Sequence, residues 1–212
     1  MSDKKVIVFI GPSLSVEKSR KILDADYRPP VKRNDILHAI NENPDIIGIV
    51  DGVFHQSPAV SHKEILKAID NNITVVGGSS MGALRAAELD DLGMIGVGYI
   101  YKQYANGNIE SDDDVSLVFT SDDYTPLSVP YINIEYNLNQ AEKENIINNN
   151  EKTDILKVAK SLYYPKRNYS SILQKVNMDL DTKNRLKNFL KSCVDIKKQD
   201  AIEVLKYIKK HL

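Results

Sequence analysis

The pattern with the clearest chemical meaning runs from Gly78 to Gly82, where the sequence reads Gly-Ser-Ser-Met-Gly. It follows an apolar run that ends at Val76 and precedes a segment with helical patterning. In this G-x-S-x-G pattern the middle serine, Ser80, can sit on a tight strand-to-helix turn that exposes its hydroxyl. Such a turn also points backbone N–H groups outward, and these suit an anion or the carbonyl of an acyl group. The pattern predicts chemistry at Ser80, with helix capping by Ser79 or Ser80 as the simpler structural alternative.

Polar and glycine residues also follow two other apolar runs, as Gly11-Pro12-Ser13 and as a segment that begins at Asp51. The carboxyl ends of parallel strands meet at one edge of a sheet, and ligands bind there. We therefore expect one cleft at this edge. Its expected residues are Gly11, Pro12, Ser13, Asp51, Gly52, Phe54, His55, His62, Lys63, Gly78, Ser79, Ser80, Met81 and Arg85.

These residue types predict a serine-centred site. Ser80 would be the nucleophile, His62 or Lys63 would take its proton, and Asp51 would orient the base. The Met81 amide and an amide of the turn at 11–13 would form an oxyanion hole. The α/β-hydrolase order, in which the acid and the histidine follow the serine, is not found here, so that fold is disfavoured.

An anion site without catalysis is the second interpretation, since glycines before a helix favour phosphate. However, the sequence has neither a G-x-x-x-x-G-K-[ST] nor a G-x-G-x-x-G pattern opening the first helix. We therefore expect no cofactor. Asp112, Asp113 and Asp114 could offer oxygens to a divalent cation. Acidic runs are more often solvated, so we expect no metal site there.

The elements that position these residues are continuous apolar runs at 6–10, 46–50 and 73–76, separated by helical patterns at 15–23, 34–41 and 61–70. Unbroken apolar runs are typical of strands buried on both faces of a parallel sheet. The alternation predicts an α/β fold with a Rossmann-like parallel-sheet core. Ser61 and Glu64 have the spacing of a capping box, which predicts a helix start at Ser61.

The composition changes near residue 137, after which Asn, Lys and Glu dominate. The run at 148–150 predicts a loop, and the apolar spacing beyond it predicts amphipathic helices with exposed lysine-rich faces, interrupted near 163–165. We therefore expect a core domain over residues 1–136 and an α-helical C-terminal region over 137–212.

Composition limits the class of protein. A formal net charge of -1, with 42% hydrophobic and 27% charged residues, gives no reason to expect nucleic-acid or membrane binding. A single cysteine, Cys193, excludes an intramolecular disulfide and fits a reducing compartment. No apolar run is long enough for a signal sequence or a membrane span, so we expect a cytoplasmic protein.

Beyond these patterns, the sequence resembles the TfuA-like family over residues 6–128. The resemblance is carried by Phe9-Ile10-Gly11-Pro12-Ser13-Leu14, Tyr27-Arg28-Pro29-Pro30, Ile49-Val50-Asp51-Gly52-Val53-Phe54, Pro58-Ala59-Val60-Ser61-His62-Lys63-Glu64-Ile65-Leu66, Ser80-Met81-Gly82-Ala83-Leu84-Arg85-Ala86-Ala87-Glu88-Leu89 and Gly93-Met94-Ile95-Gly96-Val97-Gly98.

The resemblance implies an accessory protein for YcaO enzymes, which form thioamides in peptide backbones. It implies hydrolysis of a thiocarboxylated ubiquitin-like sulfur carrier to supply sulfide, with a glycine of methyl-coenzyme M reductase as the target in methanogens. The expected partners are therefore a YcaO protein and the carrier, whose Gly-Gly tail would enter a cleft lined by Gly11, Gly52, Phe54 and Gly78. A non-catalytic adaptor and a nucleotide-binding regulator are the alternatives. The oligomeric state is left open, with a homo-oligomer among the options.

Overall fold

The computed structural model describes residues 4–53, 58–120, 122 and 124–212, and it divides into two compact units. Unit 1 comprises Met1–Asp112 and Lys197–Leu212, and unit 2 comprises Asp113–Ile196. The expected boundary between residues 136 and 137 falls inside helix α6 (Tyr131–Lys143).

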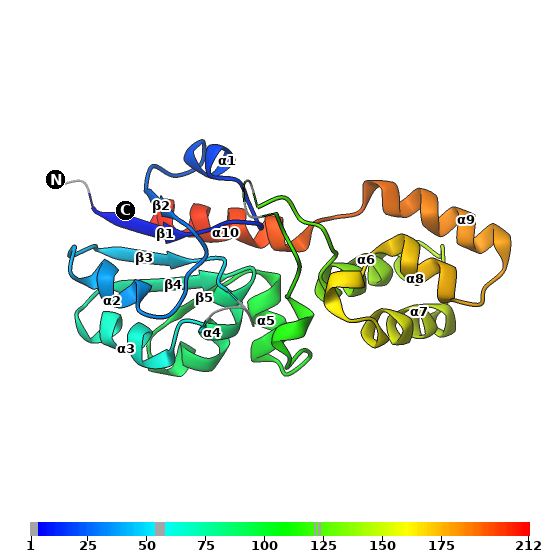
Figure 1. Cartoon of the computed structure of the whole chain (residues 1–212), viewed down its shortest axis with the longest axis horizontal. Helices are drawn as coiled ribbons and strands as arrows, with labels where there is room; N and C mark the ends of the chain where they lie inside the picture. The colour runs from blue at the N-terminus through cyan, green and yellow to red at the C-terminus, as the bar shows by residue number, and fades with distance from the viewer. Residues whose placement is uncertain (1–3, 54–57, 121, 123) are drawn as a thin grey trace. The chain divides into compact units, whose positions relative to one another are not determined.

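Unit 1 is built on a five-stranded, wholly parallel sheet in the order β2-β1-β3-β4-β5 (Figure 1). This confirms the Rossmann-like α/β fold. The strands are β1 (Val6–Phe9), β2 (Asp26–Arg28), β3 (Ile46–Ile49), β4 (Thr74–Gly78) and β5 (Ile95–Val97). The helices are α1 (Val16–Arg20), α2 (Asp35–Ile40), α3 (His62–Asp70), α4 (Met81–Leu89), α5 (Tyr99–Ala105) and, except for its first residue, α10 (Ile196–Lys210).

Successive strand residues face opposite sides of the sheet, and both sides are buried. Ile7 and Phe9 of β1 belong to the apolar cluster under α2, α3 and α4, whereas Val6 and Val8 belong to the cluster under α10, which also includes residues that flank α1. A Cβ at Gly48 of β3 would lie 2.9 Å from Ile208 of α10, so this helix lies directly on the sheet. Burial on both faces explains why the strands read as unbroken apolar runs.

The sequence patterns did not predict β2, because this edge strand is short and two of its three residues are charged. Asp26 and Arg28 form an ion pair at 2.6 Å, and Arg28 also pairs with Glu42 at 2.8 Å. Charged residues of this kind are typical of sheet edges, where they discourage pairing with another chain.

Unit 2 consists of α6, α7 (Asn149–Ser161), α8 (Tyr169–Lys175) and α9 (Leu180–Phe189) around an apolar core of their own. The interruption expected near 163–165 is present between α7 and α8. The loop expected at 148–150 is wrong in part: Asn148 accepts a hydrogen bond from the Glu151 amide and starts α7 as its N-cap. Asparagine favours both loops and helix starts, and here the glutamate three residues on completes a capping box.

The acidic run at 112–114, where unit 2 begins, is partly buried, and two of its carboxylates pair with cations. Asp113 meets the buried Arg167 at 2.6 Å, and the buried Asp114 pairs with Lys160. Among the described residues, no group of histidine, cysteine, aspartate or glutamate side chains could hold a metal ion. Charge neutralisation within unit 2 accounts for Asp113 and Asp114.

Within the described residues, no helix combines the length and the apolar character needed to cross a membrane.

Candidate active site

The candidate site lies at the carboxyl ends of β1, β3 and β4 in unit 1. In the order β2-β1-β3-β4-β5, the chain reverses its direction of travel across the sheet between β1 and β3. Ligands of doubly wound sheets bind at this switch point, because the connections leave in opposite directions and open a crevice. The turn after β1 and Asp51 after β3 flank this point.

Asp51 is the centre of the arrangement. The residue is 1% exposed, and its carboxylate accepts hydrogen bonds from the Gly11 amide (2.8 Å), the Ser13 amide (3.0 Å) and the Ser13 hydroxyl (2.6 Å). Three donors stabilise the buried charge and fix the turn after β1 against the end of β3. The structure thus brings Gly11, Ser13 and Asp51 together, as the parallel topology predicted.

Ser79 joins the same network from the end of β4. Its side chain is fully buried, and its hydroxyl lies 3.0 Å from the Ser13 hydroxyl and 2.8 Å from the Lys197 carbonyl oxygen. Its φ of 68° places it in the left-handed region, which is costly for residues other than glycine. Ser79 is therefore held tightly between β1, β4 and the start of α10.

Ser80 occupies the N-cap position of α4, yet its side chain makes no capping hydrogen bond. Its amide donates to the Gly78 carbonyl (2.9 Å) and the Val50 carbonyl (3.3 Å). In the described part of the chain, no hydrogen bond engages the Ser80 Oγ, and no buried side-chain oxygen lacks a partner. The Oγ therefore keeps some contact with solvent, although the residue as a whole is only 2% exposed.

Of the two turns expected to supply amides for an oxyanion hole, only the one at Met81 has an unused amide among the described residues. The Gly11 and Ser13 amides both donate to Asp51, and Pro12 has no N–H to offer. The Met81 amide is different, because no hydrogen bond within the described residues uses it. It is the first amide of α4, so it carries the partial positive charge of a helix N-terminus beside the Ser80 hydroxyl.

Glycines allow this turn to pack without side chains. A Cβ at Gly82 would lie 1.8 Å from the Ile49 carbonyl oxygen, and one at Gly77 would lie 2.3 Å from the Gly82 oxygen. The first turn of α4 therefore touches the backbone of β3 and β4, a close approach that only glycine permits. Gly82 of the G-x-S-x-G pattern, and Gly77 just before the pattern, thus have a packing role.

Packing also fills space near two glycines expected to line a substrate cleft. A Cβ at Gly52 would lie 2.6 Å from the Met81 side chain, and one at Gly78 would lie 2.5 Å from the Val204 side chain. The chain itself occupies the positions next to these glycines. Phe54 and His55 lie outside the described residues.

His62, Lys63 and Arg85 are placed apart from the Asp51 network. The His62 ring meets Glu88 at 2.8 Å, and the Arg85 guanidinium donates to the same carboxylate at 2.6 Å and to the Val60 carbonyl at 3.1 Å. Glu88, rather than Asp51, is therefore the carboxylate that contacts His62. Lys63 lies in the first turn of α3 with an exposed side chain.

Sequence reasoning missed three contributors to this part of unit 1. Glu88 pairs with His62 across 26 residues, and Lys197 belongs to a helix that we expected to expose its lysines. Lys197 is instead 2% exposed, and its carbonyl oxygen accepts a hydrogen bond from the Ser79 hydroxyl. Asp200, also on α10, accepts hydrogen bonds from the Tyr99 and Ile100 amides of α5. The apolar spacing of α10 predicted a helix, but it did not predict that this helix packs on the sheet.

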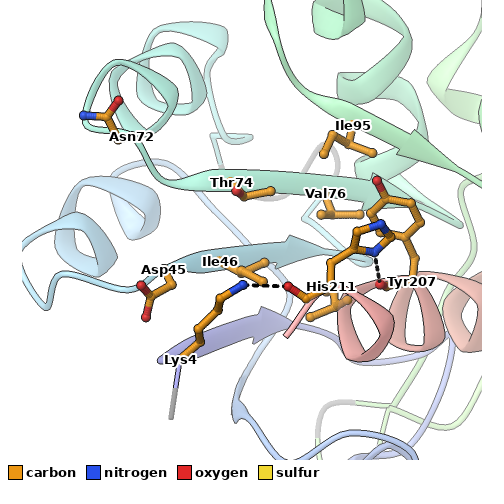
Figure 2. A pocket seen from close by; sticks show the side chains of 10 residues that line it. Lys4, Asp45, Ile46, Asn72, Thr74, Val76, Ile95, Tyr207 and His211 are labelled. Atoms are coloured by element: carbon orange, nitrogen blue, oxygen red, sulfur yellow. Dashed lines mark hydrogen bonds between the residues drawn. The ribbon is translucent and has the colours of Figure 1, made fainter. Parts of the chain in front are cut away.

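A separate hollow of about 380 Å³ lies near the amino ends of the strands (Figure 2). Its floor is apolar, with Ile46, Val76 and Ile95, and none of the predicted site residues that the structure describes lines it. Lys4 donates to the His211 carbonyl at 2.7 Å there, which ties the start of β1 to the end of α10. A cation at a helix C-terminus is a stabilising arrangement, so these contacts have a structural explanation.

Similarity to known proteins covers several of the residues described above. A family model described as TfuA-like protein matches residues 51–168, which is more than half of the chain and includes Asp51, His62, Lys63 and Ser80. A search of curated proteins gave no match.

Proposed function

This chain belongs to the TfuA-like family, and membership is consistent with a role as an accessory protein of YcaO enzymes. We propose that it releases sulfide from a thiocarboxylated ubiquitin-like carrier for peptide-backbone thioamidation. The observation that carries the catalytic part is the state of Ser80. Its hydroxyl neither caps α4 nor bonds elsewhere among the described residues, which argues against the purely structural role of an N-cap serine. The unused Met81 amide beside it supports acyl chemistry.

The proposed reaction exchanges sulfur for oxygen at the carrier's C-terminal carbonyl. The Ser80 Oγ attacks that carbon, the C–S bond breaks, and hydrosulfide leaves. Water then hydrolyses the acyl-serine ester and restores a carboxylate on the carrier, with hydrogen sulfide as the other product. The Met81 amide and the α4 N-terminus stabilise the oxyanion during both steps.

A base must take the Ser80 proton and return it to the departing sulfur. His62 and Lys63 remain the two candidate bases, because both lie in the first turn of α3, the helix that follows β3. The Glu88 partner of His62 lies two turns along α4 from Ser80. His62 is oriented by Glu88, which resembles the carboxylate–imidazole half of a catalytic triad. Lys63 carries no partner within the described residues and is free to reach a bound thiocarboxylate. Asp51 then acts indirectly, by holding the turn after β1.

The experiment is incubation of the purified protein with thiocarboxylated carrier, while sulfide and the mass of the carrier are followed. Replacing Ser80 by Ala is expected to lower the rate on the order of a thousandfold or more. Ser15 offers a matched control, since it is also an N-cap serine without a side-chain capping bond. Ser15→Ala should keep the wild-type rate.

Two results would redirect the proposal. A wild-type rate in Ser80→Ala would exclude Ser80 as the nucleophile. Binding to a YcaO protein without sulfide release by the wild type would favour the adaptor, in which the chain only recruits the carrier or the substrate. The proposed substrate in methanogens, methyl-coenzyme M reductase, is tested by mass spectrometry of its thioglycine after deletion of this protein.

A further inference from the structure

We infer that Ser79 is a positioning residue, whose buried hydroxyl holds the strained turn that presents Ser80. This inference rests on the proposed function, because it assigns a role in the same chemistry. Ser79 does not touch solvent and so is not placed to contact a substrate. Its effect on the reaction would pass through the backbone of its neighbour.

The backbone at Ser79 needs an external constraint. The Ser80 amide donates to the Gly78 carbonyl two residues earlier, at 2.9 Å, and φ of Ser79 is 68°. Together these describe a γ-turn with positive φ at its centre, which is the rare and strained hand of this turn. A serine in this conformation persists only where the surroundings hold it.

The hydroxyl supplies that constraint on two sides. It donates towards the Ser13 Oγ at 3.0 Å and the Lys197 carbonyl at 2.8 Å, so one proton is shared between two acceptors. Ser13 in turn donates to Asp51 at 2.6 Å. Side chains and backbone from β1, β3, β4 and α10 are thereby linked through a single oxygen atom.

This linkage fixes the direction of the next residue. If φ of Ser79 relaxed to the negative values that most residues prefer, the peptide between Ser79 and Ser80 would rotate. The Ser80 Oγ and the Met81 amide would then move relative to the end of β3. Displacements near 1 Å are enough to reduce turnover about a hundredfold.

The Ser79→Gly variant tests the role of the hydroxyl separately from the cost of a positive φ. Glycine adopts positive φ freely, so this variant keeps the turn accessible while removing both hydrogen bonds. Ser79→Ala removes the same bonds and keeps the conformational penalty. We expect sulfide release by Ser79→Gly to fall about ten- to hundredfold in kcat with little change in KM, because the hydroxyl does not contact substrate.

A second readout does not depend on the carrier. A fluorophosphonate probe labels activated serines, and intact-mass spectrometry follows its attachment, with Ser80→Ala as the unlabelled control. Labelling of Ser79→Gly is expected to slow by a similar factor. Circular dichroism and thermal unfolding confirm that the variants compared are folded.

The outcomes separate the two proposals. Labelling of Ser79→Gly at the wild-type rate would overturn the positioning role, whatever the carrier assay shows. Slowed labelling in a protein that releases no sulfide would retain the positioning of Ser80 and reject the proposed hydrolysis. If the wild type is neither labelled nor active, both the nucleophile and its positioning are rejected.

The network also makes a prediction about additivity. Ser13→Ala removes the partner on the β1 side and should slow labelling too. Residues in one hydrogen-bonded network give non-additive effects. The Ser13→Ala/Ser79→Gly double variant should therefore be no more than about twofold slower than the worse single variant. Fully multiplicative losses would show that Ser13 and Ser79 act separately, which contradicts a shared constraint.

Discussion

Asp51 and Asp200 are buried carboxylates that bind backbone amides in two regions of unit 1, but their hydrogen-bond networks extend differently. Each side chain is 1% exposed and accepts hydrogen bonds from two backbone amides of a distant segment. At Asp200 the carboxylate oxygens accept the first two amides of α5. At Asp51 the second carboxylate oxygen continues through Ser13 to Ser79, next to Ser80. A buried carboxylate that fixes only backbone assembles the fold, whereas one that also fixes hydroxyls can organise chemistry.

The surroundings of the two carboxylates also differ. Gly98, with φ of 99°, precedes α5, and a Cβ there would lie 2.5 Å from the Asp200 carboxyl carbon. The absence of a side chain lets α10 approach α5 closely. Burial, and to a smaller extent the nearby Glu203, raise the pKa of Asp200 to about 6, even though the two amide donors and Lys102 lower it. Asp200 therefore keeps α10 on the sheet at a cost in desolvation.

The largest effect is expected from Asp51→Ala. It leaves the buried Gly11 and Ser13 amides without an acceptor, which should lower the free energy of unfolding by on the order of 3 kcal/mol. Sulfide release should also be lost, because the Ser13–Ser79 link loses its anchor. Urea unfolding and the carrier assay measure the two effects. Full activity in the folded variant would show that the Asp51 network has only a structural role.

Asp200→Ala is expected to give a somewhat smaller loss of stability. One of its two bonds lies in a partly buried place, where water can replace the carboxylate, so about 2 kcal/mol is expected. The folded variant should release sulfide within about threefold of the wild-type rate, because no hydroxyl of the site depends on Asp200. Measurement at a temperature at which both proteins are folded makes the test fair. A loss of activity equal to that of Asp51→Ala would remove the distinction between the two carboxylates.

The pH dependence of stability sharpens the same contrast. The pKa of Asp200 is about 6 in the folded protein and 3.8 when unperturbed, so the folded state binds the proton more tightly. This contribution to stability is complete below pH 3.8 and is lost as the pH rises through about 6. Relative to Asp200→Asn, which does not titrate, the wild type should lose on the order of 2 kcal/mol between about pH 4 and pH 7. A constant difference across this range would contradict the raised pKa.

The sequence predicted the local and topological features of unit 1 better than its long-range contacts. Unbroken apolar runs identified β1, β3 and β4, and the parallel topology then placed Asp51 beside the turn after β1. The Glu64 carboxylate accepts a hydrogen bond from the Ser61 amide at 3.2 Å, as the capping-box spacing indicated. Asp200 and Lys197 could not be placed, because their partners lie about a hundred residues away and no periodicity specifies that pairing. The position of α10 on the sheet depends on shape, for example on the space left by Gly48 and Gly98.

The smallest effect on stability is expected where a carboxylate is exposed. The Glu88 and His62 side chains are 37% and 48% exposed, so Glu88→Gln should change the free energy of unfolding by no more than about 0.5 kcal/mol. Its effect on turnover depends on which residue is the base. If His62 takes the Ser80 proton, His62→Gln should slow sulfide release about a hundredfold or more, and Glu88→Gln should slow it less, through a disordered imidazole. If Lys63 is the base, both variants should keep the wild-type rate and Lys63→Met should lose it. Because each replaced side chain is itself exposed or partly exposed, the outcome assigns the base with a smaller change in folding than accompanies Asp51→Ala.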